Sequence, residues 1–99
     1  MTKILIVDDE ESILAPLEEM LSGEGYRVRA FDNPLKALEL LRTQEFDLAI
    51  FDIKMPEMNG YELLSSARTI RPGLPVIFLS SKQEEQDQII GFTLGADDF

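Results

Sequence analysis

The stretch ILIVDDE at residues 4–10 decides the fold, because four consecutive aliphatic residues are followed at once by acidic ones. A short run that is apolar at every position is typical of a strand buried on both faces, in a parallel sheet covered by helices. Two further runs of this kind are LAIF at residues 48–51 and VIFL at residues 76–79. The sequence therefore predicts three central strands of a parallel sheet.

The segments between these runs complete an alternating pattern of strands and helices. Residues 26–31 alternate arginine with smaller apolar residues, as expected of a strand nearer the sheet edge. Helical spacing of apolar residues, bounded by glycine or proline, occurs in residues 13–21, 34–41, 61–71 and 83–94. Asn33 before Pro34 predicts a helix N-cap followed by proline at the first helical position. Strictly alternating strands and helices predict a doubly wound α/β fold with a parallel sheet.

Pro16 conflicts with the first helical segment. A proline inside a helix removes one backbone hydrogen bond and costs on the order of 3 kcal/mol. We therefore expect the helix to start late or to kink at this residue.

Length, charge and composition exclude several classes of protein. The 99 residues suit one domain, residues 1–99, and the 44% hydrophobic content is too high for a disordered chain. The net charge of -10 disfavours direct binding to nucleic acid or to anionic membranes. The chain has no cysteine and no histidine, so disulfides, thiol nucleophiles and histidine catalysis are excluded. The apolar run at residues 4–7 is too short for a signal peptide or a membrane span, which predicts a cytoplasmic protein.

Polar side chains follow three of the predicted strands. Asp8 and Asp9 come after the first run, Asp52 after the run at 48–51, and Ser80 and Ser81 after the last run. Ligands bind at the carboxyl ends of strands in such sheets, so these side chains should meet in one region. Clustered carboxylates repel one another and favour a hard divalent cation such as Mg²⁺. Each aspartate taken alone is better explained as a solvated loop residue or a helix cap, and only their combination indicates a site.

Four motifs in this order make the sequence resemble bacterial response-regulator receiver domains over nearly its whole length. The motifs are ILIVDDE at residues 4–10, DIKMPEMNG at 52–60, PVIFLS at 75–80 and GADDF at 95–99. The resemblance implies a flavodoxin-like parallel sheet with strand order 2-1-3-4. It also implies a signalling domain that takes part in its own phosphoryl transfer, rather than an enzyme acting on other substrates.

The resemblance assigns a role to each acidic strand end. It implies that Asp52 is the phosphoacceptor, which receives a phosphoryl group from the phosphohistidine of a sensor histidine kinase or phosphotransfer protein. Asp9 and Asp52 would bind Mg²⁺ directly, and Asp8 mainly through water. The backbone carbonyl of Lys54 would supply a further oxygen to the metal.

The resemblance also implies a switch that couples phosphorylation to an output domain or partner. Ser80 matches the hydroxyl residue that moves to bond the phosphoryl group. Phe99 matches the aromatic switch position, where the family more often has tyrosine, so a switch that uses a phenolic hydroxyl is not expected here.

The sequence departs from the family at its last residue. The family has a lysine followed by proline a few residues beyond the position of Phe99, and this sequence stops before it. We therefore expect a C-terminally incomplete receiver whose fifth strand and last helix, roughly 20 residues, are largely missing. The strand at residues 76–79 would then be an apolar edge, and a homodimer formed by strand exchange is one hypothesis.

Three other functions are weighed against this interpretation. A phosphatase of the haloacid dehalogenase type would have a second aspartate two residues after its nucleophile, where this chain has Lys54. A flavin-binding protein of the flavodoxin type would need an uncharged, hydroxyl-rich loop where this chain has acidic residues 8–11. A receiver-like scaffold that binds partners without being phosphorylated stays open, because the family lysine is absent.

Overall fold

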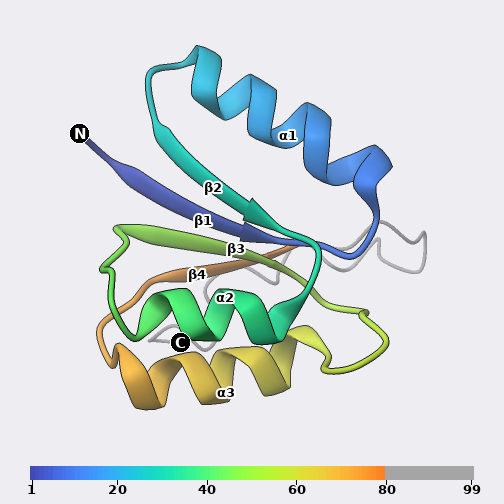
Figure 1. The fold of residues 1–99 in the computed structure, drawn as a ribbon, viewed down its shortest axis with the longest axis vertical. Helices are drawn as coiled ribbons and strands as arrows, with labels where there is room; N and C mark the ends of the chain where they lie inside the picture. Colours follow the sequence, from blue (N-terminus) through green and yellow to red (C-terminus); the bar gives the residue numbers. More distant parts are fainter. Residues whose placement is uncertain (80–99) are drawn as a thin grey trace.

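The computed structural model describes residues 1–79, and these residues form a parallel sheet of four strands with helices on both faces (Figure 1). The strands are β1 (Lys3–Val7), β2 (Arg27–Phe31), β3 (Leu48–Asp52) and β4 (Val76–Leu79). The helices are α1 (Glu11–Gly23), α2 (Pro34–Leu41) and α3 (Gly60–Ile70). The strand order is β2-β1-β3-β4, which confirms the predicted doubly wound topology.

The apolar runs form the strands that the sequence predicts. Residues 4–7 are all buried in β1, which pairs with β2 on one side and β3 on the other. The strand β2 lies at the sheet edge, with Arg27 and Arg29 exposed. It begins at Arg27 and not at Tyr26, because the Tyr26 amide donates to the Leu21 carbonyl at 3.2 Å and so belongs to the turn that ends α1.

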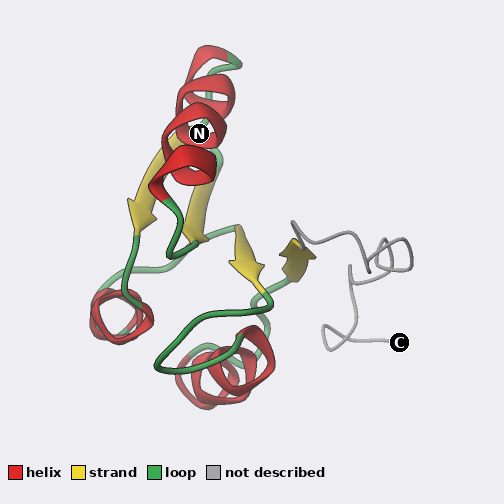
Figure 2. Cartoon of the chain, turned by 90° about the vertical axis from the view of Figure 1, so that its right-hand side faces the viewer, coloured by secondary structure: helices red, strands yellow, loops and turns green. Residues whose placement is uncertain are grey.

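The two faces of the sheet bury alternate residues of β1. Ile4 and Ile6 pack with Leu14 of α1, whereas Leu5 and Val7 face the larger core beneath α2 and α3. Figure 2 shows α1 on one side of the sheet and the other two helices on the opposite side. Each fully buried aliphatic side chain contributes about 1.5–3 kcal/mol to folding. The continuous apolar runs are therefore explained by helical cover on both faces.

The helix α1 starts at Glu11, so the late start expected from Pro16 is wrong. Pro16 lies within the helix and cannot donate a hydrogen bond to the carbonyl of Ser12. Both residues are exposed, so water can bond to this carbonyl, and the buried side of the helix at Leu14 is unaffected. The helix ends at Gly23, and Gly25 then adopts a φ of 97°, a left-handed conformation that favours glycine.

Asparagine side chains cap the other two helices. Asn33 accepts a hydrogen bond from the Leu35 amide at 2.8 Å, which confirms the predicted N-cap of α2. The helix α3 starts at Gly60, one residue earlier than predicted. Its N-cap is Asn59, which forms a reciprocal capping box with Glu62 through two hydrogen bonds of 2.9 Å.

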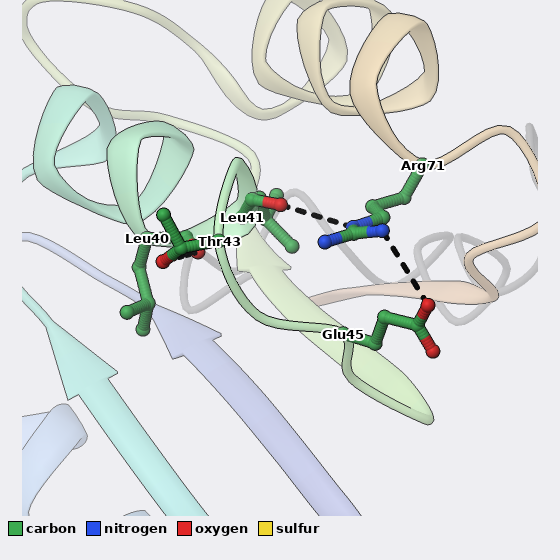
Figure 3. Close-up of polar contacts among 5 residues, drawn as sticks. All are labelled: Leu40, Leu41, Thr43, Glu45 and Arg71. Carbon is green, nitrogen blue, oxygen red and sulfur yellow. Dashed lines mark hydrogen bonds and ion pairs between the residues drawn. The ribbon is translucent and has the colours of Figure 1, made fainter.

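Arg71 connects the carboxyl ends of α2 and α3 (Figure 3). Its Nε donates to the Leu41 carbonyl at 3.0 Å, and its Nη1 lies 3.5 Å from a carboxylate oxygen of the exposed Glu45. The last carbonyls of a helix lack partners within the helix, so a cation here satisfies one of them and interacts favourably with the helix dipole. This contact lies at the end of the sheet opposite the acidic strand ends.

Candidate metal and phosphorylation site

The pairing of the central strands brings the predicted acidic residues together. Val7 of β1 is the register partner of Phe51 of β3, so the next residues along these parallel strands, Asp8 and Asp52, emerge side by side. Together with Asp9 they offer one carboxylate oxygen each, and these three oxygens lie within 4.8 Å of one another. The arrowheads in Figure 1 point to this edge of the sheet. The structure therefore assembles the three carboxylates predicted from the sequence.

The three aspartates differ in exposure, and hydrogen bonds hold Asp8 in place. Asp8 and Asp52 are buried, with only 3% and 6% of their surface exposed, whereas Asp9 is exposed. The Asp8 side chain accepts a hydrogen bond from the Glu10 amide at 2.9 Å, and the Asp8 amide donates to the Phe31 carbonyl at 3.1 Å. These bonds fix Asp8 at the rim of the core, so its carboxylate cannot turn freely into solvent.

Burial and mutual repulsion disfavour charge on the two buried aspartates. Burial raises the pKa of Asp52 to about 7, and the negative charges of Asp8 and Asp9 contribute to the increase. The pKa of Asp8 is also raised, chiefly by burial, although the hydrogen bond from the Glu10 amide opposes the change. A cation between the three carboxylates would remove the repulsion and restore their charged forms.

The donor set fits a hard divalent cation. Carboxylate oxygens are preferred by Mg²⁺, which retains several water ligands and needs only a few oxygens from the protein. The exposed Asp9 leaves one side of the cluster open to water, and the buried Asp8 and Asp52 bound the other side. The acidic cluster therefore offers Mg²⁺ three carboxylates and an open side for its water ligands.

The segment after β3 places the peptide of Lys54 beside Asp52. The Lys54 amide lies close enough to the Asp52 carboxylate to oppose part of the increase in the pKa of Asp52. The Lys54 side chain is exposed, and Met55 is buried in the core that lies under α2 and α3. That the Lys54 carbonyl binds the metal stays a prediction.

Two contacts at the site were not identified from the sequence. The Glu10 amide orients Asp8, and Gly60 packs directly against the main chain of Asp52. Gly60 is the last residue of the DIKMPEMNG motif, and its contact depends on how closely α3 approaches β3. The spacing of residues along the chain does not predict the distance between α3 and β3.

The remaining predicted site residues lie outside the described residues. These are the switch hydroxyl Ser80 and the aromatic Phe99, together with the helix predicted at residues 83–94. Their roles stay predictions from the resemblance.

Comparison with known proteins agrees with this geometry. Residues 4–99 match the family described as the response regulator receiver domain. The transcriptional regulatory protein CreB of Escherichia coli is 38% identical over 96 residues, which are 97% of this chain and 42% of that protein. The response regulator SaeR of Staphylococcus aureus is 38% identical over 99 residues, which are 100% of this chain and 43% of that protein. The chain thus spans less than half the length of these two relatives.

Solved structures of receiver domains have the same fold. A CheY-like receiver domain from Methanospirillum hungatei is 37% identical, with a TM-score of 0.78 over 88% of this chain and 71% of that one. The response regulator TrrA, solved in complex with the histidine kinase ThkA, is 36% identical with a TM-score of 0.75 over 82% of this chain and 70% of that one. By its family match, strand order and acidic cluster, the chain belongs to the response regulator receiver domains, signalling domains of two-component systems rather than enzymes.

Proposed function

We propose that Asp52 is the phosphoacceptor of this receiver domain and that Asp8, Asp9 and Asp52 hold Mg²⁺ during the transfer. The observation that carries the proposal is the position of Asp52, a carboxylate at the carboxyl end of a central strand with two further carboxylates beside it. Asp52 is the last residue of β3, and the segment that follows it leads to α3. A phosphoryl group on Asp52 would lie beside a cation held by the three carboxylates.

The transfer forms one bond and breaks another. A carboxylate oxygen of Asp52 attacks phosphorus, the bond from phosphorus to the donor nitrogen of a phosphohistidine breaks, and the imidazole leaves with a proton. Water later hydrolyses the acyl phosphate and regenerates the carboxylate and inorganic phosphate. Bound Mg²⁺ would neutralise negative charge on the transferring group and help to align it. Asp8 and Asp9 would hold the cation together with Asp52, and the Lys54 amide lies beside the acceptor carboxylate.

The donor in the cell would be a sensor histidine kinase or a phosphotransfer protein. This part of the proposal is supported by TrrA, whose structure was solved with a histidine kinase. CreB is described as a transcriptional regulatory protein, which supports an output domain or partner that reads the phosphorylation state. No helix within residues 1–79 has the length and hydropathy needed to cross a membrane. A cytoplasmic location stays a prediction.

The test is the intact mass of the protein after incubation with Mg²⁺ and acetyl phosphate, a small phosphodonor. We expect a single phosphoryl adduct that hydroxylamine removes, because hydroxylamine cleaves acyl phosphates. The adduct should disappear in Asp52→Asn and when EDTA replaces Mg²⁺. Asp32→Asn is a matched control, since this exposed aspartate follows β2 at the same sheet edge but lies outside the cluster.

Two results would contradict the proposal. An adduct retained by Asp52→Asn would place the acceptor elsewhere. No adduct on folded wild-type protein, with either acetyl phosphate or a phosphorylated kinase domain, would favour the scaffold function, in which the domain binds partners without being phosphorylated.

A further inference from the structure

The first residue of α3 packs against the main chain of the proposed phosphoacceptor. The Gly60 amide donates to the Ile53 carbonyl at 2.8 Å. A Cβ atom at Gly60 would lie 2.5 Å from the Asp52 carbonyl oxygen and 3.0 Å from the Ile53 Cα. Both atoms belong to the backbone, so no side-chain rotation can make room for a methyl group. Glycine is required here for close approach of two backbone segments.

The start of α3 is held in place by its cap and by the core. Asn59 and Glu62 form the capping box that fixes the first turn. Leu63 and Ala67 on the same helix are fully buried in the core. A methyl group at Gly60 could therefore not be accommodated by moving the helix alone.

The strand on the other side of the contact is also restrained. Phe51 pairs with Val7 of β1 and with Phe78 of β4. On the β4 side the pairing continues, because Asp52 pairs with Leu79 and the Ile53 amide donates to the Leu79 carbonyl at 3.1 Å.

The Asp52–Ile53 main chain is therefore held between α3 and β4. A methyl group at Gly60 would push directly against this main chain and shift the Asp52 carboxylate with it. The next residue, Lys54, has its amide close enough to the Asp52 carboxylate to oppose part of the increase in the pKa of Asp52.

We infer that Gly60 is a positioning residue for the phosphoacceptor. The absence of a side chain lets α3 press the Asp52–Ile53 main chain into the position at which the Asp52 carboxylate meets Asp8 and Asp9. Gly60 itself contacts neither the metal nor the phosphoryl group. This inference rests on the proposed function, because it concerns the geometry of the same site.

The test compares Mg²⁺ affinity, measured by titration calorimetry on the full chain, between wild type and Gly60→Ala. We expect affinity to fall by about tenfold or more, as is typical when support of a metal ligand is lost. The rate of phosphorylation by acetyl phosphate at fixed Mg²⁺ should fall in parallel. Gly23→Ala and Gly73→Ala are matched controls, since a Cβ at either position meets nothing within 4 Å. Both should keep wild-type affinity.

A second control separates positioning from general stability. Ala67→Gly weakens α3 at a fully buried position away from Asp52, so it should lower the melting temperature without changing Mg²⁺ affinity. If Gly60→Ala fails to fold in buffer, trimethylamine N-oxide, an osmolyte that favours the compact state, is added to this variant and to wild type alike. We expect Gly60→Ala to regain structure by circular dichroism there while its Mg²⁺ affinity stays below that of wild type.

Wild-type Mg²⁺ affinity in folded Gly60→Ala, with or without the osmolyte, would overturn the inference. Equal losses of affinity in Ala67→Gly and Gly60→Ala would also overturn it, because the effect would then follow stability alone. Failure of the proposed function can be distinguished from these two outcomes. In that case the wild-type protein itself would show no Mg²⁺-dependent phosphorylation, and the positioning role would fall with it.

Discussion

Asp52 must remain close to the core to be positioned, yet its charge is disfavoured there. In the folded state its pKa is raised from 3.8 to about 7, chiefly by burial and then by the charges of Asp8 and Asp9. Between these two pH values the folded protein binds more protons than the unfolded chain. Without a metal, protonated Asp52 therefore contributes favourably to the free energy of unfolding at low pH. This contribution is lost as pH rises from 3.8 to about 7.

This linkage predicts the stability of Asp52→Asn in EDTA. Asparagine carries no charge, so the variant should be more stable than wild type by on the order of 2 kcal/mol at about pH 8. The difference should shrink as the pH is lowered towards about 4. Urea unfolding followed by circular dichroism at a series of pH values would measure it. A wild type that is as stable as the variant at alkaline pH would show that the cluster is not repulsive.

The sequence could identify the acidic residues but not their environments. Asp8, Asp9 and Asp52 were predictable because they directly follow apolar runs, and parallel strands end at the same edge. Their different burial depends on neighbouring elements, such as the Glu10 amide that holds Asp8. The contact of Gly60 depends on the distance between α3 and β3, which periodicity does not encode.

At the scale of elements, Arg71 connects α2 and α3, which contact each other on one face of the sheet. The Leu41 carbonyl at the end of α2 accepts a hydrogen bond from its Nε, whereas its ion pair is with an exposed glutamate. A hydrogen bond from a charged donor to a helix-terminal carbonyl contributes more than an exposed ion pair. We therefore expect Arg71→Met to lower the free energy of unfolding by about 1 kcal/mol.

Glu45→Gln separates the two contacts of Arg71. It removes the ion pair only, and it should lower the free energy of unfolding by less than about 0.5 kcal/mol. Chemical denaturation of both variants would give the comparison. Equal losses in the two variants would mean that the ion pair, rather than the bond to Leu41, connects the helices.

Element boundaries were predictable where local chemistry sets them. Asn33 and Pro34 fixed the start of α2, and the Gly23 and Gly25 pair fixed the end of α1. At Pro16 the expected late start is wrong, because the cost of the proline depends on whether the carbonyl that it leaves without a partner faces water. Ser12, which carries that carbonyl, lies on the exposed face of the amphipathic helix.

At the scale of the whole molecule, the strand order was expected from the family resemblance rather than from hydrophobic pattern alone. Alternating strands and helices indicate a parallel sheet but leave several strand orders open. The order β2-β1-β3-β4 places β1 and β3 side by side at the centre, and this adjacency makes the site. A different order would have separated Asp8 from Asp52.

The net charge of -10 and the acidic cluster make the fold sensitive to cations. A ligand that binds only the folded state stabilises it by mass action. At a free Mg²⁺ concentration about ten times its dissociation constant, the gain should be about 1.4 kcal/mol. NaCl at matched ionic strength screens general repulsion and serves as the control.

Asp9→Asn tests whether the gain comes from the cluster. It removes one exposed carboxylate of the cluster without disturbing the core, so the increase in stability that Mg²⁺ gives beyond NaCl should be largely lost. Thermal unfolding of wild type and variant in the two salts would show this. If Mg²⁺ and NaCl stabilise both proteins equally, the effect is screening alone and the cluster is not a metal site.

The most direct test of the central claim identifies the phosphorylated residue itself. The protein is incubated with Mg²⁺ and acetyl phosphate and then treated with borohydride, which reduces an aspartyl phosphate to homoserine, and its peptides are sequenced by mass spectrometry. We predict homoserine at position 52 and aspartate unchanged at positions 8 and 9. Homoserine at position 8 or 9 instead, or at no position in folded protein, would contradict the assignment of Asp52 as the phosphoacceptor.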